Sequence, residues 1–289
     1  TKRGQSSRKP LDISFSSTFS VTPASDLSKL PFAPAASFIE YEKYKVANGF
    51  SYFVGKPRPA ISPVVDAYLN NPAQADQLTE PLKNVNAYDE FRSLFMAPAT
   101  RQQYYLAVSG RGQRSSHRAS FSYDRISPEF KHNVSERFVA DLFETVKLLP
   151  SLTADLGLNY VVSRTKNNGM GFDDLSTLLP YQRILDNGAY LPQPRVFYQK
   201  DKDSLVQAGY PYNWDYNLMQ EFNNKDNTTA GNNINAVAGL NYNILKGLSA
   251  NAGYQYESGS TTVINLFNEE TYFVRNQVNF STASAMAES

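Results

Sequence analysis

The sequence predicts an all-β fold: an incomplete antiparallel transmembrane β-barrel of about seven long strands. Three observations support this fold class. Apolar and polar residues alternate along seven segments, these segments are long for strands, and the connections between them alternate between short and long. Strands that cross a membrane need about 9 to 11 residues, whereas strands of soluble proteins are commonest at about half that length.

The composition narrows the class of protein. Aromatic residues make up 13% of the 289 residues, charged residues only 19%, and cysteine is absent. A barrel in lipid needs such a composition, because every second strand residue faces a wet lumen and aromatics collect at the membrane interfaces. A secreted β-sandwich could have the same composition. The lack of cysteine argues against thiolate metal sites, and a net charge of +1 gives no electrostatic case for nucleic acid.

The first strand is expected at residues 11–21, where Leu11, Ile13 and Phe15 alternate with polar residues. Such alternation gives a strand one apolar face and one polar face. Six further segments show the same period: 103–109, 117–125, 137–146, 152–163, 234–244 and 248–256.

The clearest alternation, at 152–163, predicts which side chains contact lipid, because only apolar groups face hydrocarbon at low cost. Asp155, Asn159 and Ser163 are then expected to face the lumen. The predicted lipid-facing residues are Leu152, Ala154, Leu156, Leu158, Tyr160 and Val162 on this strand, and Ile234, Leu240, Tyr242, Leu248 and Tyr254 on the last two.

The connections sort by length. If each strand reverses direction, the tight connections 110–116, 147–151 and 245–247 fall at one end of the sheet, and the long ones fall at the other: 22–102, 127–136 and 164–233. Short periplasmic turns and long extracellular loops are typical of outer-membrane barrels. Seven strands do not close such a barrel, and the chain has no signal peptide, so we expect it to be part of a longer protein.

Three phrases resemble one family. The opening TKRGQSSRKPLDISFSSTFSV is similar to the junction between plug and first barrel strand in SusC/RagA-type TonB-linked outer-membrane transporters. The phrases QQYYLAVSGRGQRSSHRASFSYDRIS and ILKGLSANAGYQY resemble two hairpins of that family, so the resemblance runs from Thr1 to about Phe280. It implies that residues 1–9 end the plug and that residues 10–289 form the N-terminal portion of the barrel.

The resemblance also implies a function and partners. Such a protein lies in the bacterial outer membrane and imports glycan fragments or peptides through a plugged 22-stranded barrel. Its partners would be a SusD-like surface lipoprotein, the TonB complex acting through the plug, and membrane lipid. No enzyme activity and no cofactor are expected. The alternative is a secreted β-rich binding or adhesion module, which would be soluble without detergent.

Few residues suggest chemistry. His117 and His132 have no nucleophile pattern near them, so solvated surface histidines are the simpler interpretation. The phrase SGRGQR does not open a helix after a strand, as a phosphate-binding loop would, and is expected to be a turn. The acidic residues of the second long loop could contribute to a calcium site, although their spacing does not match an EF-hand: Asp173, Asp174, Asp201 and Asp203.

Two loop segments stand out. Residues 35–47 carry helix-like spacing of Phe38, Tyr41 and Tyr44, which predicts a short helix. The resemblance implies that this helix packs near the lipoprotein partner. The segment GYPYNWDY, residues 209–216, is the candidate substrate-binding site, because clustered loop aromatics can stack on sugars or grip peptides. Otherwise these rings pack the loop on itself. The four candidate residues are Tyr210, Tyr212, Trp214 and Tyr216.

Overall fold

The computed structural model describes residues 10–49 and 57–288, and the chain divides into two compact units. We call them the sheet unit and the loop unit. The sheet unit consists of Thr1–Pro23, Pro98–Asn167 and Asn227–Ile264. The loop unit consists of Ala24–Ala97, Asn168–Asp226 and Asn265–Ser289. The predicted end of a plug, residues 1–9, lies outside the described residues.

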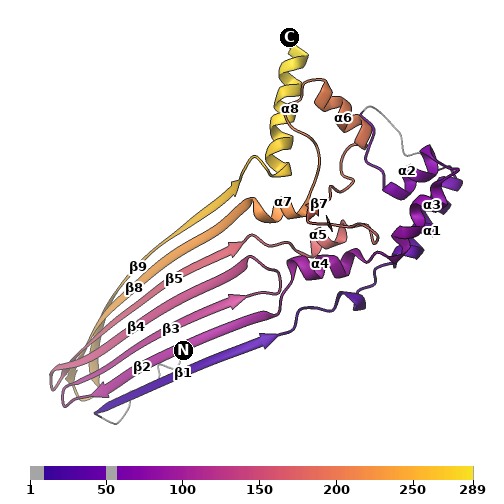
Figure 1. The fold of residues 1–289 in the computed structure, drawn as a ribbon. Coiled ribbons are helices and arrows are strands. Elements are labelled where there is room, and N and C mark those ends of the chain that lie inside the picture. The colour runs from indigo at the N-terminus through magenta and orange to yellow at the C-terminus, as the bar shows by residue number, and fades with distance from the viewer. Residues whose placement is uncertain (1–9, 50–56, 289) are drawn as a thin grey trace. The chain divides into compact units, whose positions relative to one another are not determined.

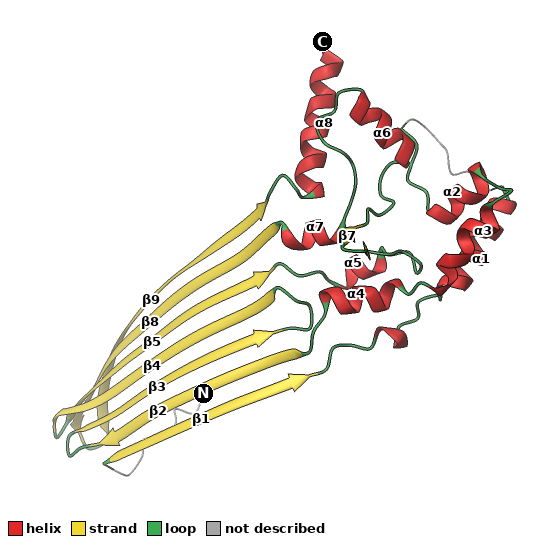
Figure 2. Ribbon diagram, in the orientation of Figure 1, coloured by secondary structure: helices red, strands yellow, loops and turns green. Residues whose placement is uncertain are grey.

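The sheet unit is a seven-stranded antiparallel sheet in the order β1-β2-β3-β4-β5-β8-β9 (Figures 1 and 2). Among the described residues, β1 and β9 each pair with one neighbour, so the sheet is open. This confirms the predicted fold class of long antiparallel strands that do not close. The strands are β1 (Leu11–Thr22), β2 (Ala99–Arg111), β3 (Ser115–Ser127), β4 (Asn133–Leu149), β5 (Leu152–Asn167), β8 (Lys225–Leu245) and β9 (Leu248–Phe267).

All seven predicted strands exist, but several are longer than the alternation indicates. Strand β8 begins at Lys225 rather than 234, and β9 continues to Phe267 rather than 256. The stretch added to β8, residues 225–233, is almost entirely polar. The stretch added to β9 is polar up to Thr262 and then has the apolar pairs Val263–Ile264 and Leu266–Phe267, so neither stretch alternates. Backbone pairing with a neighbouring strand, which sequence alternation does not report, extends them.

Two of the three connections predicted to be long are long, residues 23–98 and 168–224, whereas only residues 128–132 join β3 and β4. The tight turns are residues 112–114, 150–151 and 246–247, and antiparallel pairing places all three at one end of the sheet. Gly247 has φ +89°, a backbone conformation that favours glycine in a two-residue turn. The SGRGQR phrase, residues 109–114, ends β2 and forms the turn to β3, where the Gly112 N–H donates to the Ser115 carbonyl at 2.8 Å.

The loop unit is mainly helical. Its helices are α1 (Ala35–Ala47), α2 (Pro63–Asn70), α3 (Ala75–Thr79), α4 (Ala87–Phe95), α5 (Phe172–Ser176), α6 (Gln199–Gln207), α7 (Leu218–Asn223) and α8 (Tyr272–Glu288), with short 3-10 turns at Leu27–Lys29 and Glu80–Asn84. A two-stranded ribbon pairs β6 (Leu185–Asp186) with β7 (Ala189–Tyr190). No helix among the described residues is long and apolar enough to cross a membrane.

Local sequence explains where these helices begin. The Ser62 hydroxyl accepts from the Val65 N–H at 3.1 Å and Pro63 occupies the first turn of α2, a position where proline costs no hydrogen bond. Asn86 caps α4 by accepting from the backbone of Tyr88 and Asp89. Side chains of these helices then form a core with Ile39, Val64, Phe91 and Phe95 fully buried.

Helix α1 confirms the helix predicted at residues 35–47. The buried side of α1 is formed by Ala35, Ile39 and Glu42. Tyr41 and Tyr44 are exposed, and Phe38 packs partly against the core. The aromatic spacing therefore identifies the helix but not its buried face. The buried residues Ala35, Ile39 and Glu42 are themselves four and three positions apart, and they form a different side of the helix.

Candidate functional site

The two faces of the sheet differ in chemistry, as the cross-strand register shows. One row across six strands is apolar: Phe15, Leu106, Phe121, Ala140, Tyr160 and Ile234. The adjacent row, on the opposite face, is almost entirely polar: Ser14, Ala107, Ser120, Asp141, Asn159 and Asn235. We call the first the apolar face and the second the polar face.

The residues predicted to face lipid lie together on the apolar face. All six on β5 alternate onto it, and Tyr160, Ala154 and Leu152 pair with Ile234, Leu240 and Tyr242 of β8. On β9, Leu248 and Tyr254 are exposed. Leu156 keeps 53% of its surface exposed and Tyr254 keeps 69%. Their contact with lipid remains a prediction.

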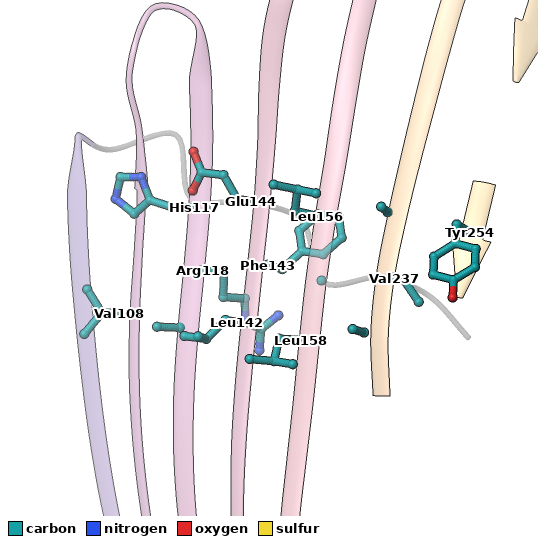
Figure 3. A pocket seen from close by; sticks show the side chains of 14 residues that line it. Val108, His117, Arg118, Leu142, Phe143, Glu144, Leu156, Leu158, Val237 and Tyr254 are labelled. Carbon is teal, nitrogen blue, oxygen red and sulfur yellow. The ribbon is translucent and has the colours of Figure 1, made fainter. Parts of the chain in front are cut away.

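Part of the apolar face is hollowed (Figure 3). The hollow has a volume of about 430 Å³ and lies where small residues of β3 and β8, Ala119, Ala236 and Ala238, stand among larger ones. Leu142, Leu156, Leu158 and Tyr254 surround them. Small side chains beside large ones leave space for an apolar group, and the paired residues His117 and Glu144 also line the hollow.

Polar residues also stand on the apolar face of β3 and β4. His117 pairs with Glu144, and Arg125 pairs with Glu136. Beyond Glu144 the apolar face continues, because Val146 pairs with Ala154. The Arg125 Nη1 is 2.7 Å from the Glu136 Oε1.

An aromatic row lies next to the Arg125–Glu136 pair. It consists of Tyr104, Tyr123 and Phe138, paired in register. The Tyr104 and Tyr123 rings stack at 6.5 Å, and the Tyr123 hydroxyl donates to Glu136 at 2.9 Å. Amphipathic rings between an apolar band and charged residues are typical of a membrane interface. Sequence analysis missed this row because it is assembled from three strands and needs their register.

The polar face is hydrogen-bonded across strands. Asn159 Nδ2 donates to the Asp141 carboxylate at 2.6 Å. The Asp155 carboxylate accepts from Thr145 at 2.6 Å and from Asn241 at 2.8 Å. The residues predicted to face a lumen, Asp155, Asn159 and Ser163, therefore lie opposite the apolar face. Asp155 and Asn159 are hydrogen-bonded there to side chains of neighbouring strands.

In the loop unit, the aromatic segment 209–216 is largely packed. Trp214 is only 3% exposed, with Tyr210 and Phe197 meeting it edge-on at 5.0 and 6.0 Å between ring centroids. Tyr216 is also buried, and burial raises its pKa to about 12. The Arg195 guanidinium lies 4.0 Å above the Tyr216 ring. Tyr210 and Tyr212 are half-exposed.

Helices α6 and α8 hold this segment in place. Asn279 accepts from the Tyr212 N–H at 3.1 Å and donates to the Tyr212 carbonyl at 2.9 Å. Arg275 donates to the Asp215 carbonyl at 2.7 Å. Lys202 is buried with its Nζ 3.5 Å from the Asp215 carboxylate, and burial lowers the pKa of Lys202. Trp214 and Tyr216 thus pack within the loop unit, and substrate contact by the four aromatics stays a prediction.

The remaining candidate residues have structural partners. Asp174 accepts from the Gly171 N–H at 2.9 Å at the start of α5, and Asp201 accepts from the Arg58 backbone N–H at 2.6 Å and from its guanidinium. Within residues 10–49 and 57–288, no three His, Cys, Asp or Glu side chains are grouped to hold a metal ion. His117 lies on β3 and His132 in the loop before β4.

Comparison with known proteins gives matches among solved structures. No family model and no curated protein matches the chain. A structure of the RagAB peptide transporter matches with a TM-score of 0.59 and 18% sequence identity, over 90% of this chain and 29% of that one. A structure of the RagAB peptide importer in the "open-open" state matches with a TM-score of 0.55 and 14% identity, over the same shares.

These matches concern the fold. The chain has the fold of part of a transporter chain and spans 29% of the length of the chains it matches. Both similar structures are of transporters rather than enzymes.

Proposed function

We propose that the chain is part of a TonB-dependent transporter of the bacterial outer membrane, a SusC/RagA-type protein that imports peptides or glycan fragments. In this proposal, residues 10–289 belong to the N-terminal portion of the barrel and residues 1–9 to the end of its plug. The sheet unit contributes barrel wall. The loop unit contributes to the chamber where substrate is captured.

One observation carries the proposal: a long antiparallel sheet exposes its apolar residues on one face and hydrogen-bonds its polar residues on the other. In water such an apolar face would be costly, at about 25 cal/mol for each Å² left exposed. A barrel wall in lipid needs this arrangement. The fold shared with RagAB structures over 90% of the chain supports the same conclusion.

The partners follow from this function. Membrane lipid would cover the apolar face, a SusD-like surface lipoprotein would act with the loops, and the TonB complex would act through the plug. The aromatic segment with Tyr210, Tyr212, Trp214 and Tyr216 would contribute to substrate capture. The RagAB structures are of a peptide transporter, which favours peptides over glycan fragments as the substrate.

Fractionation tests the proposal directly. The protein, expressed from its own gene, should sediment with outer membranes, require detergent for extraction and change its mobility on heating. Deleting the gene should reduce uptake of labelled peptides by the cells. Release into buffer as a folded monomer without detergent would contradict the proposal and support a secreted binding or adhesion module.

A further inference from the structure

Two cavities in the loop unit share a wall. Each has a volume of about 230 Å³, several times the roughly 30 Å³ of one water molecule. Four residues line both cavities: Ile61, Gln182, Gln193 and Pro194. The first cavity continues to Phe197 and Lys202, and the second continues to Glu42, Ser62 and Thr177. Each is large enough for one amino-acid side chain.

The shared wall contains two buried side-chain amides. Gln182 is 9% exposed and Gln193 is 6% exposed. The Gln182 Nε2 donates weakly to the Pro192 carbonyl at 3.4 Å. The Gln193 Nε2 is buried and has no hydrogen-bond partner among the described residues. Leaving a buried donor unpaired is costly, so such a group in a folded protein requires an explanation.

The backbone fixes Gln193 firmly. Its N–H donates to the Tyr216 carbonyl at 2.8 Å, and the neighbouring Leu191 N–H donates to Ile184 at 2.9 Å. Further along, Val196 has φ +62° and its carbonyl accepts from the Ala60 N–H at 3.0 Å. A β-branched residue is rarely found in this left-handed region, and such strain is held only where surrounding contacts determine it. The backbone that carries the unpaired Gln193 amide is therefore held in one conformation by its surroundings.

Two aromatic rings that line the first cavity, Phe197 and Tyr198, already contact other side chains. The Arg58 guanidinium lies 4.6 Å above the Tyr198 ring, whose hydroxyl donates to Asp66 at 2.7 Å. Phe197 meets Trp214 edge-on. A sugar ring would need an open aromatic face to stack on, whereas the group left without a partner here is an amide. A primary amide offers both a donor and an acceptor, which complements a peptide group.

We propose that Gln182 and Gln193 form a subsite that hydrogen-bonds the main chain of a peptide, with the peptide's successive side chains entering the two cavities. Successive side chains of an extended peptide point to opposite sides of its backbone, so two neighbouring side chains could enter the two cavities that share these amides. This inference rests on the proposed function and narrows its substrate class to peptides.

The subsite is tested by measuring the binding of two peptide mixtures to the parent protein and to two variants. Detergent-purified protein, as its own gene encodes it, is equilibrated with a mixture of random pentapeptides and, separately, with the same mixture N-methylated at every backbone amide. Gln193→Met removes the amide at similar volume, and Gln207→Met, at an exposed position on α6, is the matched control. Heat-modifiable mobility checks the folding of each variant.

We expect Gln193→Met to weaken pentapeptide binding about tenfold, the value of one hydrogen bond, and Gln207→Met to leave it unchanged. N-methylation should weaken binding to the parent protein more than to Gln193→Met. If Gln193→Met does not fold, Gln193→Glu replaces it, because Glu keeps the shape but removes the N–H donor.

The outcomes are distinct. Peptide binding by the parent with unchanged affinity in the Gln193 variant would overturn the subsite and leave the transporter proposal standing. Peptide binding weakened equally in both variants would also overturn it. A parent protein that binds no pentapeptide would overturn the subsite together with peptides as the substrate class.

Discussion

The sheet unit and the loop unit place their apolar side chains in opposite ways. In the loop unit Ile39, Phe91 and Leu218 are fully buried, as in a soluble protein. In the sheet unit Phe15 and Leu156 are 67% and 53% exposed, and their neighbours on the apolar face are exposed as well. A contiguous apolar face of this kind marks an interaction or membrane surface. The loop unit thus buries its large apolar side chains, whereas the sheet unit exposes them on one face.

The largest expected effect is a loss of stability when the core of the loop unit is disrupted. Phe91→Ala should destabilise it by about 3 to 5 kcal/mol, because Phe91 is fully buried against Phe95. Tyr41→Ala, at an exposed position, should change stability by less than about 0.5 kcal/mol. Hydrogen exchange of the α4 amides measures both. Equal protection in the two variants would show that this core does not stabilise the unit.

The next effect concerns the faces of the sheet. In the protein folded in vesicles, Leu158→Arg should cost about 2 to 4 kcal/mol, because it places a charge on the apolar face between Leu142 and Ala236. Asn159→Arg, on the polar face of the same strand, should cost much less. Urea titration of both variants gives the two values. Equal tolerance of arginine at the two positions would disprove the assignment of faces.

A smaller effect concerns the aromatic segment. Tyr212 is half-exposed, whereas Trp214 is buried and needed for packing. Tyr212→Ala should therefore weaken ligand binding roughly two- to tenfold if the ring contacts substrate, since a good aromatic contact contributes roughly 0.5 to 1.5 kcal/mol. Affinity is compared with the parent at matched expression. Unchanged affinity in a folded variant would mean that the ring only packs the loop.

The smallest effect is a pH dependence in the loop unit. Glu42 is buried, and burial raises its pKa although the Tyr181 hydroxyl donates to it. Between the unfolded and folded pKa values the folded state holds more protons, so stability falls as pH rises through this window. Glu42→Gln should remove the dependence. Protection factors of α1 amides between pH 4 and pH 8 measure it, and an unchanged slope in the variant would contradict this cause.

The sequence predicts the sheet better than the loop unit, for a physical reason. Alternation along 152–163 is a local signal, and one apolar face requires it. The loop unit is held by contacts between distant residues, such as the Arg58 guanidinium with Asp201 and Asn279 with Tyr212. A repeating pattern of apolar residues along the sequence does not indicate such long-range contacts. The helix at residues 35–47 could be predicted, but its buried face could not.

The candidate site divides in the same way. The residues predicted to lie on one face of β5 do so, because the side-chain period of a strand is two. The aromatic row of Tyr104, Tyr123 and Phe138 depends on register between strands, and the Gln182–Gln193 wall depends on the folding of a long loop. The burial of Trp214 could not be predicted either, since exposed and packed loop aromatics look alike in sequence.

The central claim is that the apolar face of the sheet contacts lipid while the polar face contacts water. The chain contains no cysteine, so single cysteines at Leu156 and Asn159 can each carry a fluorescent label in the vesicle-inserted protein. The label at Leu156→Cys should be quenched by lipid-attached quenchers and shielded from iodide, and the label at Asn159→Cys should show the reverse. Iodide quenching of both labels, without quenching from lipid, would contradict the claim.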